Sequence, residues 1–228
     1  MTGELRLGTG LSTDTGVLIG YPAARDAEAD APPVTFLGSD VRLRSGTVVY
    51  AGARIGDRFE TGHHVVVREE CRIGSDVSVW SNTVVDYGCR IGDGVKIHSN
   101  CYIAQFTDID DEAFLAPGVT IANDLYPGRD DSRDVMSGPS IGARAQIGVN
   151  VTVLPFVTIG PDSLVGAGSV VTRDVPAGAV VFGNPAVVRG SVENLADLAD
   201  RVVDAEAGSA RRFRLRASNG HGGAERTR

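Results

Sequence analysis

Aliphatic residues recur at every sixth position along most of this 228-residue chain. From Leu37 to Ile121 the residues at this step are aliphatic except for Thr61, and after a gap the same step resumes from Ile141 to Val171. A period of six is neither the 3.6-residue period of an amphipathic helix nor the alternation of a simple strand. Glycine often follows the aliphatic residue, as in Ile55-Gly56, and glycine reaches the positive φ values that tight corners need. The repeating unit is therefore a short strand followed by a turn.

Three such units make a coil of about 18 residues, and stacked coils place equivalent residues roughly 4.8 Å apart, the spacing of hydrogen-bonded strands. The sequence thus predicts an all-β fold, a parallel β-helix of hexapeptide repeats. A second inward-facing position, four residues after each aliphatic residue, holds small or β-branched side chains. All three cysteines occupy this position, Cys71 and Cys89 one coil apart and Cys101 on another face. We interpret them as packing residues in preference to a redox or metal site.

The repeat divides the chain into four regions. Residues 1–35 are interpreted as an N-terminal cap with a polar loop, and residues 36–190 as the β-helix, which a polar loop interrupts at 122–140. Apolar residues at helical spacing predict a covering C-terminal α-helix over 191–206, and residues 207–228 are interpreted as a disordered tail. A long polar excursion from a regular repeat more often serves function than folding, so we expect the interrupting loop to contribute to a site.

Composition narrows the classes of function. Acidic residues outnumber basic ones by 29 to 22, and the formal net charge of −7 argues against nucleic acid as a partner of the whole protein. Lys96 is the only lysine and no Gly-Lys-Ser/Thr sequence occurs, which excludes a P-loop. No apolar run approaches the ~18 residues of a membrane span, and the first ten residues lack the pattern of a signal peptide. With an odd number of cysteines, a disulfide framework is disfavoured, so we expect a cytoplasmic protein with no membrane partner.

Short stretches late in the repeat are similar to a known family. The similarity is carried by residues 148–155 (GVNVTVLP), 166–176 (GAGSVVTRDVP) and 183–186 (GNPA), which resemble the hexapeptide-repeat acyltransferases. It extends over roughly residues 36–190. The resemblance implies a left-handed β-helix, a handedness that periodicity alone does not report because parallel crossovers are normally right-handed. It also implies a homotrimer that binds acetyl-CoA or another acyl-CoA between neighbouring subunits and uses no metal.

Three further stretches resemble a subset of this family. They are residues 96–101 (KIHSNC), 110–118 (DDEAFLAPG) and 123–127 (NDLYP), which are similar to the N-acyltransferases that acetylate the amine of nucleotide-linked amino sugars. We therefore expect an enzyme that transfers an acetyl group from acetyl-CoA to such an amine. Acetylation of a hydroxyl on a sugar or small alcohol is the alternative among enzymes. A non-catalytic β-helix scaffold is the alternative outside them.

Histidine is the residue type best suited to take the proton of the attacking acceptor, because it titrates near neutrality. His63 stands where sugar acyltransferases of this family place their catalytic base, in the hexad that begins with Thr61. His64 and His98 are the other candidates for this role. Some members of the subset work without a protein base, and His63 would then only bind substrate. A γ-class carbonic anhydrase would need three histidines around one metal, and these three do not match its spacing.

The other candidate residues come from positions that match the family. Asn100 is expected to hold the acceptor amine and Asn123 to contact it at the entrance of the loop, so we predict His63, Asn100 and Asn123 as catalytic residues. The residues expected to bind the acceptor are His64, His98, Asp124, Tyr126 and Arg129. The residues expected to bind acetyl-CoA are Gly148, Asn150, Ala167, Ser169, Arg173, Asn184, Pro185 and Ala186, with Arg173 suited to a phosphate. For Asn100 and Asn123, a turn position in left-handed conformation is the alternative interpretation.

Overall fold

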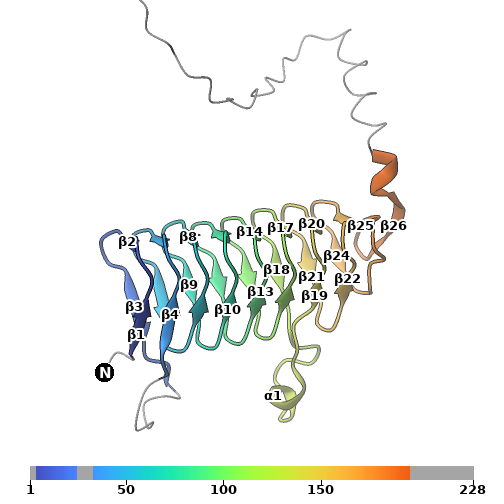
Figure 1. The fold of residues 1–228 in the computed structure, drawn as a ribbon. Coiled ribbons are helices and arrows are strands. Elements are labelled where there is room, and N and C mark those ends of the chain that lie inside the picture. The colour runs from blue at the N-terminus through green and yellow to red at the C-terminus, as the bar shows by residue number, and fades with distance from the viewer. Residues whose placement is uncertain (1–3, 25–32, 196–228) are drawn as a thin grey trace, which may run out of the picture. The chain divides into compact units, whose positions relative to one another are not determined.

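The computed structural model describes residues 4–24 and 33–195 (Figure 1). The chain divides into two units, residues 1–193 and 194–228, and the second lies almost entirely outside the described residues. The first unit is a β-helix of short strands, each paired with its equivalent one coil later, as Arg72 pairs with Arg90 and Ile73 with Ile91. No helix in the described part of the chain is long and apolar enough to cross a membrane.

Three sheets form the walls of this β-helix in the described residues, parallel except for a final hairpin. Sheet A consists of β1 (Leu5–Leu7), β4 (Thr35–Leu37), β7 (Arg54–Ile55), β10 (Arg72–Ile73), β13 (Arg90–Ile91), β16 (Asp108–Ile109), β19 (Ser140–Ile141) and β22 (Thr158–Ile159). Sheet B consists of β2 (Ser12–Thr13), β5 (Arg42–Leu43), β8 (Glu60–Thr61), β11 (Ser78–Val79), β14 (Lys96–Ile97), β17 (Phe114–Leu115), β20 (Gln146–Ile147), β23 (Leu164–Val165), β25 (Ala179–Gly183) and β26 (Ala186–Ser191). Sheet C consists of β3 (Leu18–Tyr21), β6 (Val48–Tyr50), β9 (Val66–Val67), β12 (Val84–Val85), β15 (Tyr102–Ile103), β18 (Thr120–Ile121), β21 (Thr152–Val153) and β24 (Val170–Val171).

The aliphatic residues of the sixfold step fill the interior, as the sequence predicts. Ile97, Ile103 and Ile147 are at most 1% exposed, and they stack on their equivalents in the coils before and after. The three cysteines are buried and free, which agrees with their interpretation as packing residues. Contact with the sulfur of Cys89, together with burial, raises the pKa of the Cys71 thiol well above its ordinary value.

The β-helix begins earlier than the sequence analysis predicts. Strands β1, β2 and β3 pair in parallel with β4, β5 and β6, so residues 5–21 form a first coil and not a cap. Leu7 pairs with Leu37, which is 30 residues later, whereas most coils advance by 18. The difference of 12 residues is two hexads, taken up by the polar segment between β3 and β4, so the sixfold phase is kept across the insertion. Part of that segment, residues 25–32, lies outside the described residues.

The polar loop predicted at 122–140 leaves the β-helix after β18 and returns at β19, and it contains the short helix α1 (Ser132–Val135). At the other end of the unit, β25 and β26 form an antiparallel hairpin that closes sheet B. The sequence predicts a C-terminal α-helix over 191–206. In the structure Ser191 is the last residue of β26, and Val192–Leu195 form a 3-10 helix. The remainder of that prediction and the predicted tail at 207–228 lie outside the described residues.

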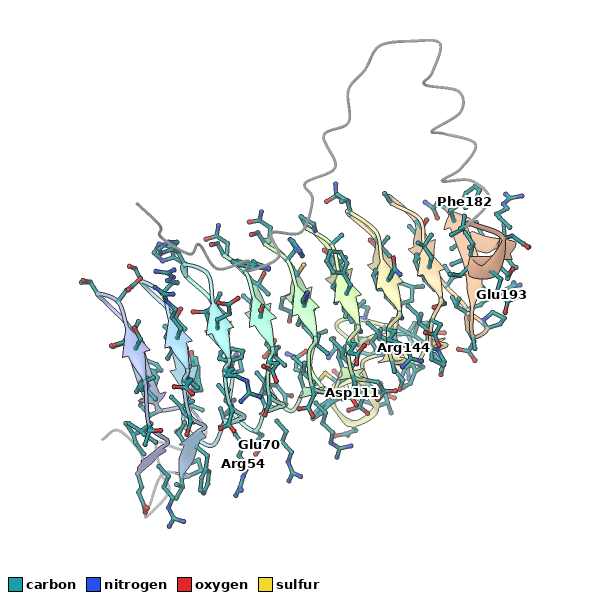
Figure 2. The ribbon with its side chains drawn as sticks, turned by 45° about the horizontal axis from the view of Figure 1, so that its top comes forward. Arg54, Glu70, Asp111, Arg144, Phe182 and Glu193 are labelled. Atoms are coloured by element: carbon teal, nitrogen blue, oxygen red, sulfur yellow. The ribbon has the colours of Figure 1, made fainter. Side chains whose placement is uncertain are left out.

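The turns between sheets form three edges, which we name after the sheets they join: A–B, B–C and C–A. The A–B edge is strongly charged. Arg58 pairs with Asp76 and Arg144 with Asp162, each at 2.6 Å across one coil step, and all four side chains are about half exposed. The backbone N–H of Arg144 also donates to the carbonyl of Asp111, so these two labelled residues mark adjacent turns of this edge in Figure 2.

Candidate functional site

The turns of the B–C edge carry His63, His64, His98 and Asn100. At one position in each turn the backbone takes a positive φ, and in the described coils this row reads Gly16, Gly46, His64, Asn82, Asn100, Gly118, Asn150 and Gly168. These residue types tolerate the left-handed conformation best. Asn100 is thus a turn residue in left-handed conformation, whereas Asn123 does not have a positive φ, and the roles of both in binding stay predictions.

The two adjacent histidines on this edge have different surroundings. The backbone N–H of His63 donates to Ser81 Oγ at 3.0 Å, and its carbonyl accepts from the N–H of Asn82 at 2.9 Å, both in the next coil. These bonds fix the backbone of His63 while its side chain is exposed. The imidazole of His64 instead packs against Gly46 of the previous coil, where any Cβ would collide with it. Both side chains are exposed, and the ring of His63 is the less constrained of the two because only the ring of His64 lies against the previous coil.

His98 lies in a row of aromatic rings beside these turns. Its ring centroid is 4.9 Å from that of Phe114 and 6.2 Å from that of Trp80, and the ring is half-buried. Trp80 is 39% exposed and precedes Ser81, which holds the backbone of His63. Sequence analysis did not select Trp80, although it is the only tryptophan of the chain. The row places an exposed aromatic surface one coil from His63.

The structure explains why Thr61 interrupts the aliphatic residues of the sixfold step between Leu37 and Ile121. Thr61 is 4% exposed, and its Oγ1 accepts from the backbone N–H of Arg44 at 3.0 Å and lies 2.9 Å from the hydroxyl of Thr47. Buried polar groups are stable when they are hydrogen-bonded in this way. The hydroxyl therefore serves the packing of the coil that carries His63.

The C–A edge carries the loop at 122–140 and the second group of candidates. Asn123 closes the neck of this loop: its Nδ2 donates to Gln105 Oε1 at 2.7 Å, and its carbonyl accepts from the N–H of Ser137 at 2.9 Å. Asp124 accepts from the N–H of Tyr126 at 2.8 Å and contacts the hydroxyl of Ser132. Both residues thus shape the loop, whatever they contact when substrate is present.

A buried carboxylate behind Gln105 was missed by sequence analysis. Asp86 is 6% exposed and accepts from Tyr102 Oη at 2.8 Å and from Gln105 Nε2 at 2.7 Å, while Arg68 lies 3.5 Å away. Burial and the hydrogen bond to Asp86 raise the pKa of Tyr102 to about 12. Asp86 fixes the amide of Gln105, which in turn holds Asn123. The sequence held one signal of this carboxylate: Asp86 directly follows the aliphatic Val85, whereas glycine follows the aliphatic residue in many other repeats.

The loop encloses a cavity of about 320 Å³ against the next coil. Asp124, Tyr126 and Arg129, three of the residues predicted to bind the acceptor, line it together. Arg129 pairs with Asp131 through two bonds of 2.8–2.9 Å and lies 5.5 Å from the ring centre of Tyr126. Phe156, which sequence analysis missed, forms the opposite wall and is 52% exposed at a φ of 63°. An exposed aromatic residue in that conformation is unusual and marks the position as one that merits mutation.

The predicted acetyl-CoA residues divide between these regions. Gly148, Asn150 and Ala167 lie on the B–C edge, as does Ser169, whose hydroxyl is buried and donates to the carbonyl of Gly166 at 2.6 Å. The same hydroxyl accepts from the backbone N–H of Gly183 at 3.1 Å, and the carbonyl of Ser169 accepts from the N–H of Thr152 at 2.9 Å, so both groups are engaged within the chain. Arg173 is exposed and lies on the C–A edge after β24. The remaining candidates lie at the closing hairpin: Asn184 and Pro185 between β25 and β26, and Ala186 at the start of β26.

Within one chain the two groups of candidates do not meet. His63 and His98 are on the B–C edge and Asn123 is on the C–A edge, with sheet C between them. The outward row of sheet C carries no charge in the described residues: it reads Leu18, Val48, Val66, Val84, Tyr102, Thr120, Thr152 and Val170. Elsewhere, no three His, Cys, Asp or Glu side chains converge into a group that could hold a metal ion in the part of the chain that is described.

Comparison with known proteins agrees with this geometry. Residues 88–123 and 138–173 match the family described as bacterial transferase hexapeptide (six repeats), and residues 65–105 match the hexapeptide repeat of succinyl-transferase. The repeat region thus matches the hexapeptide-repeat transferase families over residues 65–123 and 138–173. The fold is accordingly their left-handed β-helix. Among solved structures, the polySia-specific acetyltransferase NeuO has this fold, with a TM-score of 0.51 at 17% identity over 96% of this chain and 95% of that one.

Two further proteins that are similar to this chain are named as acetyltransferases. Galactoside O-acetyltransferase of Escherichia coli (strain K12) is 40% identical over 81 residues, which are 34% of this chain and 40% of that protein. The chain therefore aligns with less than half the length of this curated relative. A structure of perosamine N-acetyltransferase from Caulobacter crescentus aligns at 26% identity with a TM-score of 0.48, covering 66% of this chain and 57% of that one.

Proposed function

We propose that this protein is an acetyl-CoA-dependent acetyltransferase that acetylates the amine of a nucleotide-linked amino sugar. The observation that carries the proposal is the exposed imidazole of His63, whose backbone is fixed by Ser81 and Asn82 within a hexapeptide-repeat transferase fold. Asn100 on the same edge and Asn123 with Asp124 at the loop support an amino-sugar acceptor, because they match that subset of the family. Acetyl-CoA lies along the late coils of the B–C edge, near Gly148 and Asn150.

The active site is completed by a second subunit of a homotrimer. Closed symmetric assembly is the common state of such proteins, and an uncharged outward row on sheet C suits a face that turns toward copies of itself. With sheet C facing a threefold axis, the B–C edge of one subunit meets the C–A edge of the next. His63 of one subunit then faces the loop with Asn123 and Tyr126 of its neighbour. The charged A–B edge, with pairs such as Arg58 and Asp76, turns to solvent.

Acetyl transfer in this arrangement is a direct attack on the thioester. The amine nitrogen bonds to the carbonyl carbon, the carbon–sulfur bond breaks, and the coenzyme leaves as a thiolate. The proton that the nitrogen loses passes to the imidazole of His63 and from there to the thiolate or to water. Orientation of both reactants between two rigid β-helices lowers the entropic part of the barrier.

The state of His63 favours an amine over a hydroxyl acceptor. In the described residues no carboxylate hydrogen-bonds to the imidazole of His63, so none of these residues holds the ring in one orientation. A neutral sugar amine already has a free lone pair, whereas a hydroxyl must lose its proton as it attacks and so needs the stronger base. The second candidate function is O-acetylation of a sugar, which is favoured by the 40% identity to a galactoside O-acetyltransferase over 81 residues.

The proposal is tested with purified protein, acetyl-CoA and a panel of UDP- and dTDP-linked amino sugars together with their hydroxyl analogues. Free thiol release and the mass of the product are measured. Acetylation of an amino sugar is the expected result. Turnover of the hydroxyl analogues alone would move the assignment to O-acetylation, and failure to bind or consume acetyl-CoA would favour a non-catalytic scaffold.

A further inference from the structure

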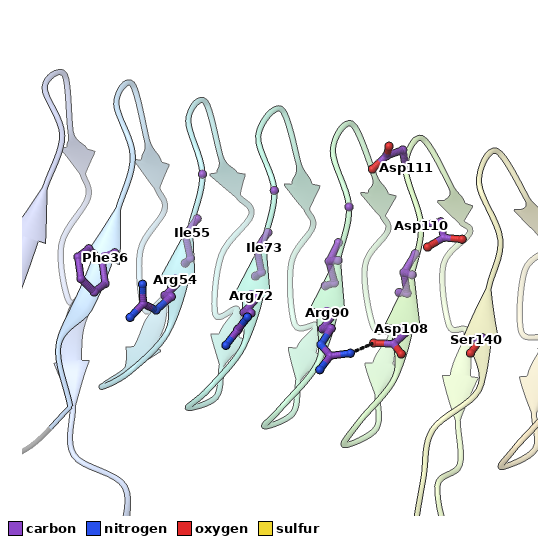
Figure 3. Close-up of a pocket in the computed structure, with 15 residues that line it drawn as sticks. Phe36, Arg54, Ile55, Arg72, Ile73, Arg90, Asp108, Asp110, Asp111 and Ser140 are labelled. Atoms are coloured by element: carbon purple, nitrogen blue, oxygen red, sulfur yellow. Dashed lines mark ion pairs between the residues drawn. The ribbon is translucent and has the colours of Figure 1, made fainter.

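A row of arginines crosses the outward side of sheet A. Arg54 on β7, Arg72 on β10 and Arg90 on β13 occupy equivalent positions in three consecutive coils, paired in register. All three side chains are exposed. Equivalent strand positions are ~4.8 Å apart, so the row spans roughly 10 Å. Figure 3 shows the three side chains side by side on adjacent strands.

The positive charge of this row is poorly compensated. Arg90 reaches Asp108 only at 3.9 Å, Arg54 lies 4.4 Å from the ring centre of Phe36, and Arg72 has no ion pair with any described residue. On the A–B edge, by contrast, the arginines that face the next coil bond to carboxylates at 2.6 Å. Like charges opposite each other on neighbouring strands destabilise a sheet. A ligand that brings negative charge to this row would remove that repulsion.

The arginines line a groove of about 850 Å³, which falls within the range of small-molecule sites, ~300–1,000 Å³. Phe36 lies at one end of the groove and Ser140 at the other. Beyond Arg90 the lining changes sign, because Asp108 and Asp110 follow in the next coil. The positive part is therefore short, and it adjoins a part lined by carboxylates and a hydroxyl.

We propose that this groove is a binding site for a small molecule with two or three phosphates in a row, of the nucleoside di- or triphosphate type. Guanidinium groups bind phosphate oxygens through pairs of parallel hydrogen bonds, and three of them on three consecutive coils match a short oligophosphate. The carboxylate of Asp108 and the hydroxyl of Ser140 are placed to accept hydrogen bonds from sugar hydroxyls. A long polyanion fits less well, because the acidic residues interrupt the row.

This site is separate from the one proposed for acetyl transfer. Sheet A lies opposite the B–C edge, which carries His63, and it borders the C–A edge, whose loop ends at Ser140. None of the residues proposed for acetyl transfer lines the groove. Binding is measured without acetyl-CoA or acceptor, so a failure here would leave the acetyltransferase proposal untouched, and the reverse also holds.

The test is titration calorimetry of the full chain at low salt with inorganic tripolyphosphate and, separately, with ATP. The wild type is expected to bind, and the Arg54→Ser/Arg72→Ser/Arg90→Ser variant to bind at least ~10-fold more weakly, since each charged contact contributes to affinity. Serine is compatible with this strand position, because Ser140 occupies it on β19. Arg42→Ser is the matched control: Arg42 is exposed at the equivalent strand position of sheet B, and its removal is expected to leave binding unchanged.

Arg72→Lys keeps the charge but removes the forked donor, and a loss of several-fold is expected if the geometry matters. Tighter binding of ATP than of tripolyphosphate identifies a nucleotide as the ligand, and equal binding identifies any oligophosphate. No binding of either probe, binding unchanged in the triple variant, or an equal loss in Arg42→Ser would overturn the proposal. So would an affinity that keeps rising with the length of a polyphosphate chain. Circular dichroism checks that each variant is folded.

Discussion

Replacing Thr61 by valine should destabilise the β-helix, although valine has nearly the same shape and is more apolar. The mutation removes the acceptor of the Arg44 N–H, at 3.0 Å, and the partner of the Thr47 hydroxyl, at 2.9 Å. A buried donor left without a partner costs ~1–3 kcal/mol. Thr47 can turn its proton to the carbonyl of Gly62, which lies at 3.4 Å, so the main loss is at Arg44. Burial of one more methyl group returns at most ~0.8 kcal/mol, which leaves a net loss between about 0.2 and 2.2 kcal/mol.

The assay is unfolding in urea followed by circular dichroism, at one fixed protein concentration because the proposed trimer would make stability depend on concentration. Thr158→Val is the control, since Thr158 is exposed on β22 and its hydroxyl has no hydrogen bond with the described residues. That control should change the free energy of unfolding by no more than ~0.5 kcal/mol. If Thr61→Val is as stable as the wild type, the hydrogen bonds of Thr61 do not matter and the reasoning is refuted.

Three further outcomes are expected. His63→Ala should lower kcat/KM by at least ~100-fold with an unchanged urea midpoint, and near-normal turnover would exclude His63 as the base. The double variant Val66→Glu/Val84→Glu should convert a trimer to smaller species by light scattering, whereas Gln146→Glu, at an exposed position of sheet B, should not; equal masses would remove sheet C from the interface. Because the pKa of Tyr102 is raised to about 12, the folded state favours the neutral phenol, and the stability this provides is complete below pH 10 and lost as pH rises toward 12. Tyr102→Phe should show a smaller fall in unfolding free energy over that interval, and an identical fall would contradict the assignment.

The β-helix was predictable because its interior residues recur at a fixed step. Each repeat consists of a strand with an inward aliphatic residue, followed by a turn. The sequence analysis did not predict the first coil, and the reason is physical. One of its three inward residues is Thr13, and an excursion between β3 and β4 separates it from Leu37. The excursion adds whole hexads, so Leu7 and Ile19 keep the phase of the repeat, and this was the signal that could have found them.

The candidate site was predictable only in part. The pairing of Gln105 with Asn123 follows from the register, since 18 residues separate them as they do equivalent positions of adjacent coils. The contacts of Asp86 with Tyr102 and Gln105 depend on side-chain directions at a turn, which the repeat does not specify. The wall that Phe156 adds to the loop cavity depends on how the loop folds back on the next coil. Neither the contacts of Asp86 nor the wall formed by Phe156 follows from sequence spacing alone.

The central claim is that acetyl transfer takes place between subunits, with His63 from one and the loop held by Asn123 from the next. It is tested most directly by co-expressing His63→Ala and Asn123→Ala chains and measuring acetyl-CoA turnover of the mixed assemblies. Each variant alone should be inactive, and random assembly of equal amounts should restore about one quarter of the wild-type sites. A mixture no more active than the two variants measured separately would contradict the claim.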